Sequence, residues 1–184
     1  YSAGYQFESF VKWYPYSKYA EEALFQAAYC KYLEAPDYTL DQTLTKQSMD
    51  AFQEYIEKYP NSERVAEANK LMDELRENLI EKDYQNAFNY YKTMQYHAAC
   101  VSFKRFLNDY PDVSQKRENA MYYIVLAGYK YANNSVEDKL KERFEEVILD
   151  YERYSVVFAN MKDEKKRKEL ENIYNESKIK YNGL

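Results

Sequence analysis

The segment from Ile80 to Pro111 constrains the fold more than any other part of this chain, because small and aromatic residues recur in it at helical spacing. Ala87 and Ala99 are small enough to let two helix backbones approach closely. The seam between the helices is filled by aromatic side chains, namely Tyr90, Phe103 and Phe106. Pro111 cannot continue a helix, so it ends the second one. This pattern predicts two short antiparallel helices packed against each other.

Parts of this unit recur along the chain. A Tyr-Pro pair followed by polar residues and a serine occurs at 14–15, 59–60 and 110–111. Around the first two pairs, the sequences FVKWYPYSKYAEEA and YIEKYPNSERVAEA align over fourteen residues. The proline ends one helix, and the serine two residues later, Ser17 or Ser62, is expected to be the N-cap of the next. Repeated helix pairs are typical of tetratricopeptide repeats, whose period is about 34 residues.

We therefore predict an all-α fold: a right-handed superhelical stack of antiparallel helix pairs with a C-terminal capping helix. Residues 1–184 are expected to form one helical-repeat domain. Its expected parts are the second helix of a truncated repeat (1–15), a repeat with an inserted loop at 34–43 (16–60), a repeat with an extended first helix (61–111), a further repeat (117–152) and the capping helix (156–182). A lone second helix leaves its apolar face uncovered, so we expect at least about 17 further residues before it.

The longest expected element is the first helix of the 61–111 repeat. Residues 63–94 contain neither Pro nor Gly and keep the helical spacing of apolar residues. They predict one helix of about 30 residues, roughly 45 Å long. A kink near residues 81–83 is the alternative, because the apolar stripe thins there. The later helices are expected at 118–133, 137–151 and 156–181, with Gly183 as the final C-cap.

Composition excludes several classes of protein. Three Gly and four Pro are too few for a β sandwich, which needs frequent turn residues. No stretch approaches the ~18 consecutive apolar residues of a membrane-spanning helix. The net charge of −5 argues against nucleic acid as a partner. Acidic residues interrupt the basic run at 162–168, which indicates a solvated helix face. The 23 tyrosines suit half-buried helix faces and protein-binding surfaces.

No set of residues indicates catalysis. His97, the single histidine, is expected in a surface turn without the convergent partners that a catalytic or metal site needs. Cys30 and Cys100 fall in different helix pairs, too far apart for a disulfide, and are expected to be free buried thiols. The chain has no Gly-rich phosphate loop and no nucleophile elbow. We therefore expect no enzyme, no catalytic residue, no cofactor and no metal.

The remaining candidate for function is the concave side of the stack, which the first helix of each pair lines. From the repeat register, the residues expected to line it are Tyr84, Phe88, Tyr91 and Lys92 from one unit and Tyr122, Val125, Tyr129 and Asn133 from the next. An aromatic groove with scattered polar groups suits an extended peptide or a partner loop. The alternative is that these rings only pack neighbouring helices.

Several segments together resemble the BamD/YfiO family of outer-membrane assembly lipoproteins. They are Pro60 to Ser62 with the long helix, Tyr90 and Tyr91, Ala98 and Ala99, Phe103, and Leu107 to Pro111. The stretch LDQTLTKQSMDAFQEYIEKYPNS, from Leu40 to Ser62, is similar to the middle of that family. The resemblance covers most of residues 7–133.

This resemblance implies a lipoprotein on the periplasmic face of the bacterial outer membrane, held there by an acylated cysteine upstream of this chain. It implies a stack of five tetratricopeptide repeats that helps to insert β-barrel proteins. The expected partners are periplasmic domains of the barrel insertase, other assembly lipoproteins and unfolded barrel segments.

The expected function is therefore that of a non-enzymatic scaffold or adaptor in outer-membrane β-barrel assembly. A different periplasmic tetratricopeptide adaptor, for pilus assembly or envelope coordination, is the alternative. An enzyme whose catalytic domain lies upstream is a third.

Overall fold

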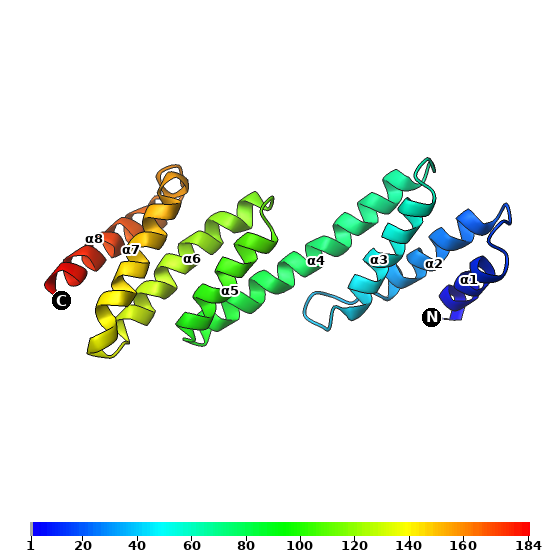
Figure 1. Ribbon diagram of the computed structural model, residues 1–184. Coiled ribbons are helices and arrows are strands. Elements are labelled where there is room, and N and C mark those ends of the chain that lie inside the picture. Colours follow the sequence, from blue (N-terminus) through cyan, green and yellow to red (C-terminus); the bar gives the residue numbers. More distant parts are fainter. Residues whose placement is uncertain (1) are drawn as a thin grey trace. The chain divides into compact units, whose positions relative to one another are not determined.

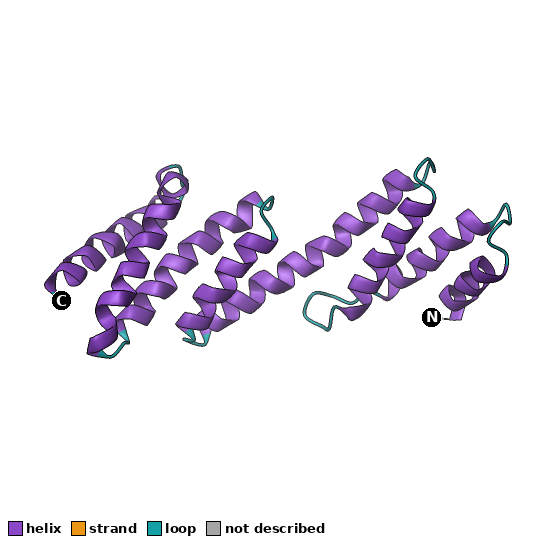
Figure 2. Cartoon of the chain, in the orientation of Figure 1, coloured by secondary structure: helices purple, strands orange, loops and turns teal. Residues whose placement is uncertain are grey.

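The structure is a computed structural model that describes residues 2–184, apart from the side chains of Ser114 and Gln115. The described part is all-α, as predicted, with helices joined by turns and loops (Figures 1 and 2). The helices are α1 (Ser2–Trp13), α2 (Ala20–Glu34), α3 (Thr43–Lys58), α4 (Val65–Lys92), α5 (Tyr96–Asp109), α6 (Ser114–Asn133), α7 (Glu137–Ala159) and α8 (Glu164–Gly183). They form two compact units, one that ends at Lys82 and one that begins at Asp83.

Aromatic side chains of α2 and α3 form the core of the first unit. The ring of Phe25 meets Phe52 and Tyr55 edge-on, with centroids 5.8 and 5.3 Å apart. All three residues are buried, and burying a side chain of this size stabilises the fold by roughly 1.5–3 kcal/mol. On the other side of α2, a Cβ atom added to Gly4 of α1 would lie 3.1 Å from the Cβ of Cys30. The absence of a side chain at Gly4 therefore allows α1 and α2 to approach closely.

The two Tyr-Pro junctions of the first unit have the same hydrogen bonds. At the first, Ser17 N–H donates to the Tyr14 carbonyl at 3.0 Å, and Ala20 N–H donates to the Ser17 carbonyl at 2.9 Å. At the second, Ser62 N–H donates to the Tyr59 carbonyl at 3.1 Å and Val65 N–H to the Ser62 carbonyl at 3.2 Å. The repeat seen in the sequence is thus a repeated pair of turns.

The prediction that these serines are N-caps is wrong. α2 begins at Ala20 and α4 at Val65, three residues after the serine in each case. The serine hydroxyl instead accepts a hydrogen bond inside the turn, from Tyr19 N–H at Ser17 and from Arg64 N–H at Ser62, both at 3.2 Å. The chain needs these extra residues because it reverses direction between two antiparallel helices.

The long helix α4 is a single element, two residues shorter at each end than the predicted 63–94. It begins in the first unit and ends in the second, and the division between the units falls between Lys82 and Asp83. That is the position at which the apolar stripe of the sequence thins. Apolar burial therefore weakens at 81–83 without ending the helix.

α4 ends in a Schellman motif that has methionine in the usual position of glycine. Gln95 N–H donates to the Tyr90 carbonyl at 2.9 Å, and Met94 N–H donates to the Tyr91 carbonyl at 3.1 Å. Met94 has φ 61°, the left-handed conformation that side chains with a Cβ rarely adopt. Its side chain is 74% exposed. Core packing therefore does not explain a methionine here.

The second unit packs α5 and α7 against α6. Phe103, Ile124 and Phe144 are buried in its core, one from each of these helices. A Cβ atom added to Gly128 of α6 would lie 3.3 Å from a methyl group of Val147, so this glycine allows α6 and α7 to approach closely. Among the described helices, none combines the length and the hydropathy of a membrane span.

Two predicted boundaries in the second unit are wrong. α6 begins at Ser114 rather than 118, so residues 114–117 are helical and not loop. Arg117 there donates to the Leu107 and Tyr110 carbonyls at 2.7 and 3.3 Å, which satisfies free carbonyls at the end of α5. α7 continues to Ala159 instead of ending near 151.

The last helix, α8, therefore begins at Glu164 and not at 156. Its N-cap is Asp163, whose carboxylate accepts hydrogen bonds from the backbone N–H groups of Lys165 and Lys166. Phe158 and Met161 are buried at the corner between α7 and α8. Phe158 lies in the part of α7 beyond the predicted end, and Met161 lies in the connection to α8.

Candidate protein-binding site

Three of the predicted groove residues form one row of rings on α4, which we name the aromatic face: Tyr84, Phe88 and Tyr91. Their spacing of four and three residues places them on one side of the helix. Phe88 stacks on both of its neighbours, with ring centroids 6.4 Å apart in each case. Tyr123 of α6 packs against the same row, 5.1 Å from Phe88 and 5.0 Å from Tyr91. All four rings are half-buried.

Two lysines cover parts of this row. The ammonium group of Lys92 lies 4.5 Å from the ring centre of Phe88. That of Lys130 lies 5.0 Å from Tyr91 and 5.6 Å from Tyr96. A hydrogen bond with Tyr91 raises the pKa of Lys130, and the negative charge of Glu169 adds to this effect. Neither lysine forms an ion pair with a carboxylate of the described residues. The aromatic face thus carries two lysines that form no ion pair in the described part of the chain.

The other predicted groove residues, on α6, do not form an open surface. Val125 is fully buried, and Tyr122 is only 7% exposed. Tyr129 and Asn133 are hydrogen-bonded to α8, through Glu176 and Lys180 respectively. The structure therefore divides the predicted set into a row on α4 and a row on α6 whose members are buried or hydrogen-bonded to α8.

α8 covers α6 through a ladder of polar contacts in strict register. Each contact joins residues 47 positions apart, so the two helices run parallel. Its members are Asn119 with Lys166 at 2.8 Å, Tyr122 with Glu169 at 2.7 Å, Tyr129 with Glu176, and Asn133 with Lys180. Burial, together with the hydrogen bond to Glu169, raises the pKa of Tyr122. The last helix thus packs beside α6 in the manner of a further first helix.

Sequence reasoning missed Tyr123 and Lys130, which complete the aromatic face. The repeat register assigns Tyr122 and Tyr129 to the concave side, and each missed residue lies one position further along α6. One residue turns a helix by about 100°, so an error of one position exchanges the side that faces α8 for the side that faces α4. Tyr122 and Tyr123 are adjacent and of the same type, so the sequence is compatible with either of them on the concave side.

His97 and the cysteines show no arrangement for chemistry. His97 is exposed and lies in the first turn of α5, rather than in the preceding connection, with its ring 5.0 Å from that of Tyr131. Both Cys30 and Cys100 are free. Burial raises the pKa of the Cys100 thiol to about 12, which makes it a poor nucleophile. In the described part of the chain no cluster of His, Cys, Asp and Glu is placed to hold a metal ion.

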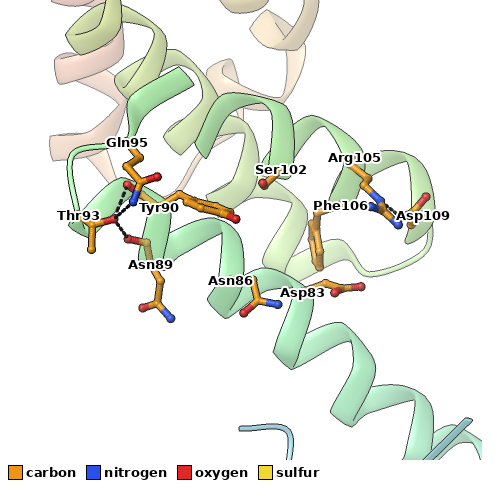
Figure 3. Close-up of a pocket in the computed structure, with 10 residues that line it drawn as sticks. All are labelled: Asp83, Asn86, Asn89, Tyr90, Thr93, Gln95, Ser102, Arg105, Phe106 and Asp109. Carbon is orange, nitrogen blue, oxygen red and sulfur yellow. Dashed lines mark hydrogen bonds and ion pairs between the residues drawn. The ribbon is translucent and has the colours of Figure 1, made fainter. Parts of the chain in front are cut away.

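A second surface lies between α4 and α5, and we name it the amide groove. It has a volume of about 560 Å³. Its lining residues are Asp83, Asn86, Asn89, Tyr90, Thr93, Gln95, Ser102, Arg105, Phe106 and Asp109. Figure 3 shows their side chains, which come from α4, from α5 and from the turn between them, and border the same space. Most of the lining is polar, with the buried ring of Phe106 between the two helices.

Comparison with known proteins gives two matches. The model of the YfiO family, described as outer membrane lipoprotein, matches residues 1–143. The chain is also similar to the outer membrane protein assembly factor BamD of Caulobacter vibrioides. The two are 28% identical over 120 residues, which is 65% of this chain and 39% of that relative. The chain thus aligns with well under half the length of this relative.

Proposed function

Because the chain belongs to the YfiO family of outer membrane lipoproteins, we propose that it is a non-enzymatic scaffold in the assembly of outer-membrane β-barrel proteins. Two observations support this proposal. The similar protein of Caulobacter vibrioides is named an outer membrane protein assembly factor. The fold itself consists of packed helix pairs, which present extended surfaces for other proteins.

The aromatic face of α4, with Lys92 and Lys130, is the surface we propose for the main partner. Half-buried tyrosines and phenylalanines give much contact area with little loss of side-chain freedom, and they often dominate binding energy. The two lysines form no ion pair with a described carboxylate, so an acidic group on a partner could pair with them. This combination is the observation that carries the proposal.

The partners we propose are the periplasmic domains of the barrel insertase, other assembly lipoproteins and unfolded barrel segments. The same proposal puts the chain on the periplasmic side of the outer membrane. Of the eight residues predicted to bind partners, Tyr84, Phe88, Tyr91 and Lys92 remain the best candidates. Tyr122 and Val125 are buried, and Tyr129 and Asn133 form hydrogen bonds to α8, so we give these four a lower priority.

Affinity capture of the full-length protein from envelope extracts tests this function. We expect the barrel insertase to be recovered, and the double variant Lys92→Glu and Lys130→Glu to recover at least about tenfold less, because both cations become anions. The matched control is Lys70→Glu at the other end of α4, which should recover the insertase normally. No insertase with the unmodified protein, or equal recovery with the double variant, would contradict the proposal.

A further inference from the structure

The amide groove lies on the side of α4 opposite the aromatic face. Asn86, Asn89 and Thr93 follow each other at intervals of three and four residues, so they form one stripe along the helix. The two asparagines are exposed, and their side-chain amides form no hydrogen bond with other described residues. This stripe is therefore polar, ordered by its helix and open to a ligand (Figure 3).

We propose that the amide groove binds an extended segment of a partner protein that carries lysine or arginine side chains. The carboxamide of asparagine has a donor and an acceptor in the same plane, which match the N–H and C=O groups of an extended backbone. From Asp83 to Lys92 the helix rises about 14 Å, the length of about four extended residues at about 3.3 Å each. This site is separate from the surface proposed for the insertase, so it does not rest on that function.

The charges in the groove favour a basic segment. Arg105 and Asp109 neutralise each other, with Nε and Oδ2 3.1 Å apart. Asp83 accepts a hydrogen bond from the Tyr110 hydroxyl at 2.7 Å, but no described lysine or arginine forms an ion pair with it. The groove therefore holds one uncompensated negative charge. A cationic side chain placed beside Asp83 would balance it.

The unusual end of α4 adds a second indication. Met94 lies between Thr93 and Gln95, both of which line the groove, and it has the left-handed backbone conformation described above. The exposed apolar side chain of Met94 is not held by core packing, although the position favours glycine. Contact with the aliphatic part of a bound lysine or arginine side chain would bury it.

Binding of short synthetic peptides to the purified chain tests the proposal. The probes are fluorescently labelled, blocked peptides of about six residues, one set alternating threonine with lysine and a matched set alternating threonine with glutamate. We expect fluorescence anisotropy to detect saturable binding of the lysine peptide and at least about tenfold weaker binding of the glutamate peptide. A lysine peptide with methylated backbone nitrogens should also bind more weakly, since it cannot donate to the carboxamides.

Variants of the protein locate the site. The double variant Asn86→Ala and Asn89→Ala should weaken binding of the lysine peptide about tenfold or more, and Asp83→Asn should reduce the preference for lysine over glutamate. The matched control is Asn172→Ala on the exposed side of α8, which should bind normally. Circular dichroism is used to check that every variant is folded. No saturable binding, equal binding of the two peptides, or binding unaffected by the asparagine variants would overturn the proposal.

Discussion

The last third of α4 has two faces with opposite chemistry. One carries Tyr84, Phe88 and Tyr91, whose rings stack on each other and on Tyr123 of α6. The other carries Asn86 and Asn89, whose amides are exposed and unpaired among the described residues. The same stretch of helix, from Tyr84 to Tyr91, thus contributes to the packing of the second unit on one face and presents open hydrogen-bonding groups on the other. Substitutions on the two faces are therefore expected to have different effects, which can be measured separately.

The largest effect on stability is expected from substitution of Phe103, whose ring packs against the aromatic face. Its ring lies edge-on to Tyr84 at 5.7 Å and stacks on Tyr123 at 5.6 Å, and it is fully buried. Phe103→Ala should lower the free energy of unfolding by about 3–5 kcal/mol, because the buried ring is lost and a cavity is left in the core. Urea denaturation followed by circular dichroism measures this. Val101→Ala, an exposed site on the same helix, is the control, and an equally small loss at both sites would contradict the assignment.

Alkaline pH should also affect the packed side of the second unit. Burial raises the pKa values of Tyr122, Tyr123 and Tyr129 above the ordinary value of 10.0. A raised pKa means that the folded state holds the proton more tightly, so this stabilisation is complete below pH 10 and is lost as the pH rises further. Thermal unfolding at a series of pH values checks the decline. Tyr122→Phe should make the decline shallower, and an unchanged slope would contradict the role given to Tyr122.

A smaller effect, of opposite sign, is expected at Met94 beside the amide groove. Met94→Gly should raise the free energy of unfolding by about 0.5–1 kcal/mol, because glycine adopts a positive φ without steric cost. Met94→Ala is the matched control: it keeps the Cβ and should give no gain. Denaturant titration of both variants distinguishes them. If the proposal for the groove holds, Met94→Gly should bind the lysine peptide more weakly while being more stable.

The smallest effect is expected at His97. It is exposed, and its one described ring contact is with Tyr131. His97→Ala should change the free energy of unfolding by less than about 0.5 kcal/mol and leave recovery of the insertase unchanged. The same denaturation and capture measurements check this. A larger change would give this histidine a role that neither face of α4 explains.

Much of the fold could be predicted from the sequence because packing leaves a periodic trace. Ala87, Ala99 and Phe103 are fully buried, at positions chosen from spacing alone. The exact helix ends were harder. Ser17 and Ser62 are of a residue type that is common at N-caps. A serine that caps a helix and one that lies in a turn differ only in backbone geometry, which the sequence does not show. The corner at Phe158 and Met161 was missed because two buried residues there follow no repeat motif.

The candidate site could be predicted only in part. Tyr84, Phe88 and Tyr91 follow from helical spacing, but the covering of α6 by α8 depends on contacts 47 residues apart, which local patterns do not contain. The amide groove left no signal, because exposed asparagines on a helix resemble any solvated face. The proposal that it binds a peptide depends on two features: Asp83 forms no ion pair with a described lysine or arginine, and Met94 has a left-handed backbone conformation. Both are properties of the folded chain alone.

Site-specific photo-crosslinking in the cell envelope tests the central claim most directly. A photoreactive amino acid is placed at Lys92 on the aromatic face, at Asn86 in the amide groove, or at Asn172 as an exposed control on α8. If the aromatic face binds the barrel insertase, the insertase is crosslinked at position 92 and not at 86 or 172. Absence of that crosslink at 92, or equal crosslinking at all three positions, would contradict the account.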